Sequence, residues 1–384
     1  MVEAVRQGQS QHDVAHAFHV SQSTVQYWVQ RSADQALDEV DWFDRSHQPR
    51  APLRTPVAVE DLVLAVRREL AQESDLGFHG AEMIHAVLRQ RQVQPLPSVR
   101  TINRILRRRG AFDGQRRVRR APPPLGWYLL QVAAKRAELD SFDIVEGLVI
   151  KGGPQVEVLN GVSLHGGLAV SWPVAQAVTA KFVVKALIEH WQQFGLPSYA
   201  QFDNDTVFQG PHTYPDVIGR VARLCLSLGV IPVFVPIRET GFQAGMESYN
   251  GTWQAKVWVR FRHSNLQGLH EHSRRYQEAL RVHRAERIEA APPRRGFPKR
   301  WRLDLQAPLQ GCLIYLRRTN GAGEVEVLGR SVLVDPQWPH RLVRAEVDLE
   351  RGEMRFYRLR RRTPKDQPLI KRIKYKVKRS KFTE

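Results

Sequence analysis

Three acidic residues that lie far apart in the sequence have surroundings suited to metal-dependent chemistry. Asp143 sits inside the apolar stretch Phe-Asp-Ile-Val, where a charge is costly unless it is paired or bound to a metal ion. Asp203 follows a short apolar segment and precedes an asparagine, and Glu247 has Asn250 three positions later, on the same face of a predicted helix. Three carboxylates converging from these points would form a hard-oxygen site for two Mg²⁺ or Mn²⁺ ions. Any one of them alone is more often a surface acid or a helix cap.

The segments around these acids predict a mixed α/β sheet with helices on its faces. Asp143 falls on the first predicted strand, Asp203 at the carboxyl end of the fourth, and Glu247 one turn into the last helix, which starts near Ala244. Pro173 is expected to end the third strand, because a proline donates no hydrogen bond to a neighbouring strand. The predicted strands span residues 137–150, 155–164, 168–174, 199–202 and 231–235, and the other helices span 179–194 and 218–228.

The charge of the chain indicates a polyanionic partner. The 384 residues include 58 Lys and Arg against 39 Asp and Glu, a formal net charge of +19, which is too basic for an ordinary metabolic enzyme. Residues 137–257 hold 7 basic and 11 acidic residues, a net charge of −4, so the flanks together carry +23. Residues 100–120 contain nine arginines, and residues 356–384 contain twelve lysines and arginines. This distribution predicts a carboxylate-bearing core between parts that hold DNA.

Composition argues against several other classes of protein. No apolar run approaches the roughly 18 residues that a membrane span needs, and the N-terminus lacks the apolar block of a signal peptide. Cys225 and Cys312 have no neighbouring Cys or His at ligand spacing, so neither a disulfide framework nor a structural zinc site is supported. We therefore expect a cytoplasmic protein with no membrane partner, associated with the nucleoid when bound to DNA.

Two segments before the core, residues 1–45 and 55–112, have the pattern of helix-turn-helix units. In the first, Ser21 is a natural N-cap, and the helix after it exposes polar side chains in its first turns. In the second, Ser98 caps a helix with one apolar side and one side rich in arginine. Each unit alone could instead be a structural helical hairpin. The side chains expected to contact DNA are Ser23, Thr24, Gln26, Arg100, Thr101, Asn103, Arg104, Arg107 and Arg108.

The remaining segments predict a linker, a small β domain and a basic tail around a core at residues 137–290. Residues 113–136 have the composition of a basic, Pro-rich linker, because an arginine cluster is followed by Ala-Pro-Pro-Pro. Five short strands separated by glycine turns predict a small all-β barrel at residues 305–362. This barrel would either help to bind DNA or serve oligomerisation only. Residues 363–384 predict a basic tail that follows the DNA backbone.

The order and context of the acids resemble those of DDE-type insertion-sequence transposases, whose catalytic core is similar to that of retroviral integrases. The family places the first Asp on the first strand, the second in an Asp-Asn pair after the fourth strand, and the Glu on a helix with Asn three residues later. The resemblance covers residues 1–360 and implies a multidomain protein with an α/β RNase H-like core, all-α helix-turn-helix N-terminal domains and a small all-β barrel C-terminal domain. The acids are 60 and 44 residues apart, and the matching motifs are Phe142-Asp143-Ile144-Val145, Phe202-Asp203-Asn204 and Gln243-Ala-Gly-Met-Glu247-Ser-Tyr-Asn250.

The resemblance implies a polynucleotidyl transferase that uses metal-dependent phosphoryl transfer. Asp143 would bridge two Mg²⁺ or Mn²⁺ ions, with Asp203 and Glu247 each holding one. The ions would activate water to cut the 3′ end of a mobile element and then activate the released hydroxyl to attack target DNA. The implied partners are the element ends, the target DNA and further copies of the chain. Asn250 and Lys256 are expected to contact DNA from the catalytic helix and its continuation.

Several departures from the family leave alternatives open. Asp140 competes with Asp143 for the first position, and Asp205 follows the Asp-Asn pair where the family often has glycine. Asp143 is preferred because its flanks match better and are more apolar. The last interval is longer than in integrases, which implies an insertion around residues 210–216. The alternative functions are a helix-turn-helix regulator with a catalytically inactive core, a metal nuclease that cleaves without joining, and an inactive remnant of a mobile element.

Overall fold

The chain folds into two compact units, Met1–Val59 and Glu60–Glu384. Within the residues that the structure describes, no helix is long and apolar enough to cross a membrane. Parts of the expected insertion, linker and basic tail lie outside these residues, at 212–214, 113–124, 378–381 and 383–384. The computed structural model describes residues 1–44, 55–112, 125–211, 215–236, 239, 241–377 and 382.

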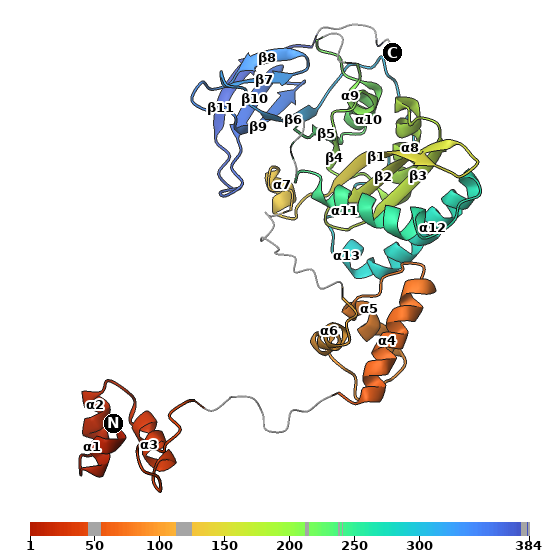
Figure 1. Cartoon of the computed structure of the whole chain (residues 1–384). Helices are drawn as coiled ribbons and strands as arrows, with labels where there is room; N and C mark the ends of the chain where they lie inside the picture. Colours follow the sequence, from red (N-terminus) through yellow and green to blue (C-terminus); the bar gives the residue numbers. More distant parts are fainter. Residues whose placement is uncertain are drawn as a thin grey trace. The chain divides into compact units, whose positions relative to one another are not determined.

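The smaller unit contains three short helices around a small apolar core. Val14, Ala15 and Val25 are the buried members of that core. Ser21 begins the third helix as predicted, because its side chain accepts a hydrogen bond from the backbone N–H of Thr24 at 3.2 Å. The helices are α1 (Val2–Arg6), α2 (Gln11–Ala17) and α3 (Gln22–Arg31), drawn in red in Figure 1.

Three further helices share one apolar core, and all of their residues except the first three of the first helix belong to the larger unit. Ile84, Leu88 and Ile102 are fully buried between them, at the apolar positions of the sequence pattern. Ser98 caps the last of the three as predicted, by accepting a hydrogen bond from the backbone N–H of Thr101 at 3.2 Å. The arginine-rich side of that helix therefore lies away from the shared core. The helices are α4 (Val57–Gln72), α5 (Ala81–Gln90) and α6 (Val99–Arg108).

Residues 125–136 pack on the larger unit through buried side chains at 127–129 and 132, although the sequence predicts a linker there. Trp127 and Tyr128 are buried, and a short helix, α7 (Leu130–Ala133), follows them. The Tyr128 hydroxyl donates a hydrogen bond to the side chain of Gln201 in the central sheet. The prediction was wrong here because it extended the basic, Pro-rich composition past residue 124, where aromatic side chains with a large apolar area begin.

A mixed sheet forms the centre of the larger unit, and its first five strands lie close to the predicted segments. β2 and β3 run antiparallel on one side of β1, while β4 and β5 run parallel to β1 on its other side. These strands are β1 (Leu139–Val149), β2 (Gln155–Ser163), β3 (Ala169–Ala175), β4 (Tyr199–Phe202) and β5 (Ile231–Phe234). The helices of this region are α8 (Ala180–Phe194), α9 (Thr206–Gln209), α10 (Arg220–Ser227), α11 (Ala244–Trp253), the π-helix η1 (Gln254–Trp258), α12 (Leu266–His283) and α13 (Ala285–Glu289).

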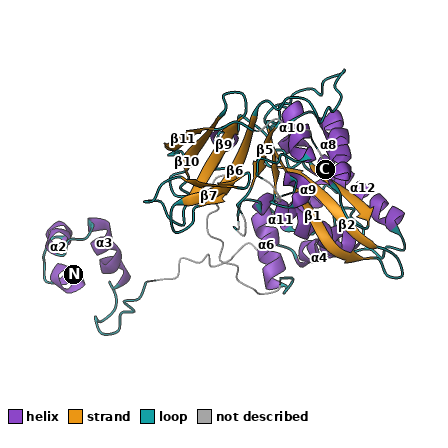
Figure 2. Cartoon of the chain, turned by 90° about the horizontal axis from the view of Figure 1, so that it is seen from above, coloured by secondary structure: helices purple, strands orange, loops and turns teal. Residues whose placement is uncertain are grey.

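The alternation of side chains along β1 divides them between two apolar cores. Phe142 packs with residues of α8 and α10, whereas Val145 packs with residues of α11 and α12. Figure 2 shows α8 and α11 on opposite sides of β1. Asp143 shares its face with Val145, because successive side chains of a strand point to opposite faces. The first acid of the predicted triad therefore faces α11.

The third strand does not end at Pro173, contrary to the prediction. β3 runs on to Ala175, and Pro173 lies opposite Val158 of β2. β3 is the edge of the sheet, and an edge strand tolerates a proline whose nitrogen faces away from its one neighbour. The position of a strand within a sheet depends on the whole fold, so local sequence did not reveal this tolerance.

The C-terminal strands extend the central sheet to nine strands, in the order β11-β10-β9-β6-β5-β4-β1-β2-β3 (Figure 1). The sequence predicts a separate barrel and a basic tail here, but β6 runs parallel to β5 and pairs Val233 with Ile314. This pairing covers the edge of β5, whose backbone groups would otherwise lack partners. β11 lies inside the expected tail, and β7 and β8 form a separate hairpin. The strands are β6 (Cys312–Arg318), β7 (Glu324–Val327), β8 (Arg330–Leu333), β9 (Leu342–Asp348), β10 (Glu353–Arg358) and β11 (Leu369–Lys374).

Candidate active site

Asp143 lies partly buried on β1, against α11. Its Oδ2 accepts a hydrogen bond from Nδ2 of Asn250 on that helix, at 2.8 Å. Burial raises the pKa of Asp143 to about 6, and the negative charges of Asp203 and Glu247 act in the same direction. A carboxyl group with like charges around it and one amide donor is well suited to exchange its proton for a cation.

Asp203 lies directly after β4, beside Asp143. The parallel pairing of β4 with β1 brings the two acids to neighbouring strands of the sheet. Oδ1 of Asp203 accepts a hydrogen bond from the backbone N–H of Asp205 at 3.0 Å. Burial raises the pKa of Asp203, and the charges of Asp205 and Glu146 raise it further. Two neighbouring carboxyl groups with raised pKa values mark this end of the sheet as a region of strong negative potential.

Glu247 and Asn250 lie on α11, which begins at Ala244 as predicted. Glu247 is exposed in the first turn of the helix, and Asn250 follows one turn later. The sequence predicts a DNA contact for Asn250, whereas its side chain donates to Asp143 in the structure. The spacing of three residues that places it beside Glu247 also turns it toward β1.

The three carboxylates occupy one region, but they do not form a ready-made metal cluster. Among the described residues, no group of three or more His, Cys, Asp or Glu side chains is placed to hold an ion. The chemistry of the donors nevertheless fits a divalent cation, because all three acids offer hard oxygen atoms. Burial raises the pKa of Asp143, and the negative charges of Asp203 and Glu247 add to this effect. A cation at this place would offset that repulsion.

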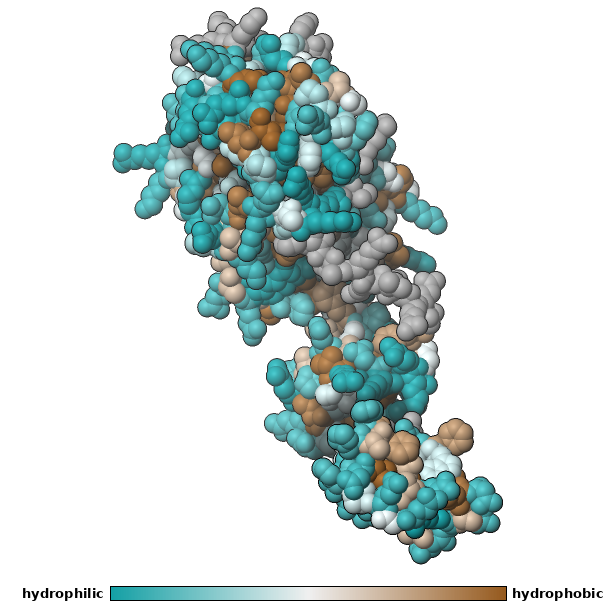
Figure 3. All heavy atoms as spheres, turned by 90° about the vertical axis from the view of Figure 1, so that its left-hand side faces the viewer, coloured by the Kyte–Doolittle hydropathy of each residue, from teal (hydrophilic) through white to brown (hydrophobic). Residues whose placement is uncertain are grey.

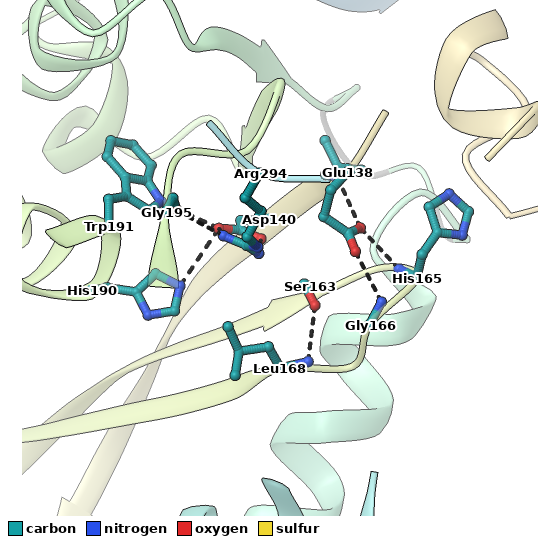
Figure 4. A network of polar contacts seen from close by, with 11 residues as sticks. Glu138, Asp140, Ser163, His165, Gly166, Leu168, His190, Trp191, Gly195 and Arg294 are labelled. Atoms are coloured by element: carbon teal, nitrogen blue, oxygen red, sulfur yellow. Dashed lines mark hydrogen bonds and ion pairs between the residues drawn. The ribbon is translucent and has the colours of Figure 1, made fainter. Parts of the chain in front are cut away.

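Asp140, three residues before Asp143 on the same strand, belongs to a different network (Figure 4). Both its oxygens bind Arg294, and Oδ2 also accepts a hydrogen bond from Nε1 of Trp191 at 3.2 Å, with Nε2 of His190 3.5 Å away. Burial opposes the charge of Asp140, but Arg294 and His190 outweigh this and lower its pKa to about 2. With both oxygens engaged, Asp140 ties β1 to α8 and to the segment after α13.

Asp205, the alternative to Asp203, caps a short helix. Its Oδ1 accepts a hydrogen bond from the backbone N–H of Val207 at 2.7 Å, at the start of α9. The neighbouring Asn204 donates through Nδ2 to the carbonyl of Val235 at 2.5 Å, which joins the ends of β4 and β5. The Asp-Asn-Asp run thus divides into three roles, and only Asp203 acts on the pKa of Asp143.

Two polar residues of this region were not singled out from the sequence. Glu146 lies at a β-bulge of β1, and its charge raises the pKa of Asp203. Asn160 on β2 is paired with Asp143 in the sheet, is fully buried, and donates through Nδ2 to Oδ1 of Asn250 at 2.9 Å. A single asparagine within an apolar strand is the signal that could have drawn attention to Asn160. Only the register of β1 with β2, however, shows that Asn160 lies beside Asp143.

The residues of α3 that the sequence assigns to DNA lie on the surface of the smaller unit. Ser23 and Gln26 are exposed, and Thr24 is half-buried. Oγ of Ser21 lies 2.8 Å from Oγ of Ser23 and 2.8 Å from Oγ1 of Thr24, so both hydroxyl groups take part in the helix cap. Their contact with DNA stays a prediction.

The arginine-rich side of α6 is exposed, but one of its residues is held within the unit. Arg108 binds the buried Glu60 of α4, and Arg109 binds the same carboxylate. Arg108 therefore stabilises the packing of α6 on α4, which the sequence did not indicate. The surface on the side of the C-terminal strands is also mostly hydrophilic (Figure 3). The other residues of α6 predicted to contact DNA, all exposed except the half-buried threonine, are Arg100, Thr101, Asn103, Arg104 and Arg107.

Lys256 makes an internal contact that the sequence did not indicate, and its contact with DNA stays a prediction. It lies in η1, the π-helix that continues α11, and its Nζ donates to the carbonyl of Gly77 at 2.8 Å. Arg260, just after η1, donates to the carbonyls of Ser74 and Gln72 at 2.5 and 2.7 Å. These two cations attach the turn between α4 and α5 to the continuation of α11.

Comparison with known proteins yields a distant structural likeness and no family assignment. No protein-family model matches the chain, and no curated protein matches it. Among solved structures, the cryo-EM structure of a simian T-cell lymphotropic virus intasome in complex with PP2A regulatory subunit B56 gamma is similar at 11% identity. The match covers 68% of this chain and 87% of that chain, with a TM-score of 0.35.

Proposed function

We propose that the protein is a DDE-type transposase that binds the ends of a mobile DNA element and catalyses metal-dependent 3′-end cleavage and strand transfer into target DNA. The observation that carries the proposal is the placement of Asp143 on the strand next to β4 and against α11, where burial, followed by the charges of Asp203 and Glu247, raises its pKa to about 6. The proposal is also supported by the order of the acids, which follows that of the family along β1, β4 and α11.

In this proposal the three acids would hold two Mg²⁺ or Mn²⁺ ions, which would supply Lewis-acid activation of water and of the 3′-hydroxyl. Asn250 holds Oδ2 of Asp143 through its amide. Asp143 releases its proton before it acts as a ligand, because a protonated carboxyl group binds cations poorly. Asp140 and Asp205 take no part in this proposal, since Arg294 engages both oxygens of Asp140 and Oδ1 of Asp205 caps α9.

The proposed partners are the DNA of the element ends, the target DNA and further copies of the chain. Exposed arginines of α6, such as Arg104, would bind phosphates, which gives an affinity that falls steeply with salt. The proposal includes a homo-oligomer, because the two ends of an element would be cut and joined together.

Nicking of supercoiled plasmid DNA tests the chemistry without knowledge of the end sequence. We expect nicking by the wild-type protein with Mg²⁺ or Mn²⁺, and none with EDTA. The Asp143→Asn, Asp203→Asn and Glu247→Gln variants should bind DNA and fail to nick it. Wild-type activity in any of the three would contradict the assignment. Joining of pre-cut duplexes, made from the DNA that borders the reading frame, then separates a transposase from a nuclease that only cleaves.

A helix-turn-helix regulator with an inactive core is the second candidate, favoured by one observation. Within the described residues the three acids are not arranged as a finished metal cluster. Such a regulator would bind DNA in EDTA and never nick it. Under either function, Arg104→Gln should make the slope of log binding constant against log salt concentration less steep, by the amount expected for the loss of about one phosphate contact. Arg108→Gln is the matched control, and it should mainly lower stability because Arg108 is paired with Glu60.

A further inference from the structure

A row of three polar side chains crosses the sheet against α11. The antiparallel register pairs Asp143 of β1 with Asn160 of β2, and Asn160 with Ser171 of β3. Apolar side chains of the same strands, among them Val145, Val158 and Val162, surround the row and pack with residues of α11 and α12. Each member of the row meets a polar group of α11: Oγ of Ser171 lies 2.7 Å from the Tyr249 hydroxyl, and Asn160 and Asp143 both contact Asn250.

The contacts of Asn160, Asn250 and Asp143 form a chain of hydrogen bonds with one direction. Nδ2 of Asn160 donates to Oδ1 of Asn250 at 2.9 Å, and Nδ2 of Asn250 donates to Oδ2 of Asp143 at 2.8 Å. An asparagine amide has one donor end and one acceptor end. If the Asn250 amide turned over, its oxygen would face the Asp143 carboxylate and its NH₂ would face the NH₂ of Asn160. The contact with Asn160 therefore selects the end of Asn250 that meets Asp143.

Asn160 is poorly suited to its position by packing alone. The residue has 0% of its surface exposed, and its Oδ1 accepts no hydrogen bond from the described residues. A buried carbonyl oxygen without a donor is unfavourable, whereas a leucine of similar size would match the apolar face around it. A polar side chain that conflicts with its local environment in this way is expected to serve the site beside it.

We propose that Asn160 is a positioning residue of the candidate active site, which orients the amide of Asn250 and through it the oxygen of Asp143 that would bind a metal ion. Asn160 touches no reacting atom and acts through Asn250. The consequence for activity rests on the proposed function. The contact itself is open to a test that needs neither metal nor DNA.

Side-chain NMR tests the contact directly. The chain contains six asparagines, so labelling with ¹⁵N-asparagine yields six side-chain amide signals, and Asn250→Ala identifies the signal of Asn250 by its loss. In Asn160→Leu we expect the Asn250 signal to move and its protons to exchange faster with solvent. Ser171→Ala is the matched control: it removes the neighbouring contact with α11 and should leave the Asn250 signal in place. An Asn250 signal unchanged by Asn160→Leu would overturn the proposal.

Stability and metal dependence separate positioning from packing. Asn160→Leu should melt at the wild-type temperature or above, yet need about 10-fold to 100-fold more Mg²⁺ for half-maximal plasmid nicking, as found for residues that orient metal ligands. Ser171→Ala should melt earlier, because the Tyr249 hydroxyl loses its partner, with an unchanged Mg²⁺ requirement. An unchanged Mg²⁺ requirement in Asn160→Leu contradicts the proposal.

Two further outcomes are distinguishable. If the wild-type protein never nicks DNA, the proposed function fails, while the NMR comparison still decides the role of Asn160. If Asn160→Leu does not fold, Asn160→Thr replaces it, because threonine suits a strand and its hydroxyl is one bond too short to reach Asn250. The same shift and faster exchange of the Asn250 signal are expected, and an unchanged Asn250 signal would overturn the proposal.

Discussion

Asp140 and Asp143 are three residues apart on β1, and their electrostatic environments are opposite. Burial raises the pKa of both carboxyl groups, so burial alone does not distinguish them. Arg294 and His190 lower the pKa of Asp140 to about 2, whereas Asp203 and Glu247 help to raise the pKa of Asp143 to about 6. An odd spacing places the two on opposite faces of the strand. The sign of the neighbouring charges thus separates a structural acid from a candidate metal ligand.

The largest expected effect is the loss of activity in Asp143→Asn. Plasmid nicking should fall by more than about 100-fold, since removal of a ligand exceeds the effect of changing its supporting contacts. The melting temperature should stay the same or rise, because the neutral amide is not repelled by Asp203 and Glu247. Nicking assays and thermal melts check both statements. Activity close to wild type, or a folded fraction as low as that of Asp140→Asn, would remove the distinction between the two aspartates.

Asp140→Asn, the matched substitution, should act on stability. Arg294 would remain largely buried without a counter-charge, at a cost of about 3–5 kcal/mol in the free energy of unfolding. Urea unfolding measures this change. The double variant Asp140→Asn/Arg294→Gln serves as the control and should recover part of the loss. If the two substitutions instead add independently, Asp140 and Arg294 do not form a coupled pair.

Changes of pH should act on the two aspartates in opposite directions. The folded pKa of Asp140, about 2, lies below its ordinary value of 3.8, so its contribution to stability is present above about pH 4 and is lost as the pH falls toward 2. The folded pKa of Asp143, about 6, lies above 3.8, so the cost of ionising it is absent below about pH 4 and complete above pH 6.

These pH ranges predict a measurable difference in stability between the wild type and Asp143→Asn. The variant should gain stability over wild type at pH 7, and this gain should disappear between pH 6 and pH 4 in urea unfolding. Metal-dependent nicking by wild type should rise with pH through about 6, as Asp143 loses its proton. A gain in stability that is constant with pH would contradict a raised pKa of Asp143.

The smallest expected effect concerns Asp203 and Asp205, which follow β4. Here too one acid is a candidate metal ligand, Asp203, and the other is structural, Asp205. Asp205→Ala should lower the free energy of unfolding by about 1 kcal/mol through loss of the α9 cap, with nicking within a few-fold of wild type. Asp203→Asn should instead abolish nicking and leave the free energy of unfolding nearly unchanged. Chemical denaturation and nicking assays on both variants check this pair. Loss of nicking in Asp205→Ala would return Asp205 to the list of candidate ligands.

Features that depend on a few neighbouring residues could be predicted from the sequence. Ser21 and Ser98 cap their helices, α11 begins at Ala244, and β4 spans the predicted residues 199–202. Capping needs only a side-chain oxygen and a backbone N–H within one turn. The strands of the core follow from runs of β-branched and aromatic residues of ordinary strand length.

Features that depend on distant partners could not be predicted. The sequence assigns Lys256 and Arg108 to DNA, which stays a prediction, and it did not indicate their contacts with Gly77 and Glu60 within the protein. A basic side chain looks the same in sequence whether its partner is a phosphate or a carbonyl oxygen. The parallel pairing of β6 with β5 likewise joins segments that share no local signal.

Local patterns were sufficient to identify the acids, their order along the chain and the elements that carry them, because alternation, capping and apolar runs act over a few residues. The role of each acid depended on the tertiary structure. Asp140 and Arg294 are in contact although they are 154 residues apart in the sequence. The same separation is 107 residues for Asp143 and Asn250, and 90 residues for Asn250 and Asn160. Whether a buried carboxylate faces a cation or another carboxylate is a property of strand register and helix placement, and these arise only when the whole chain packs.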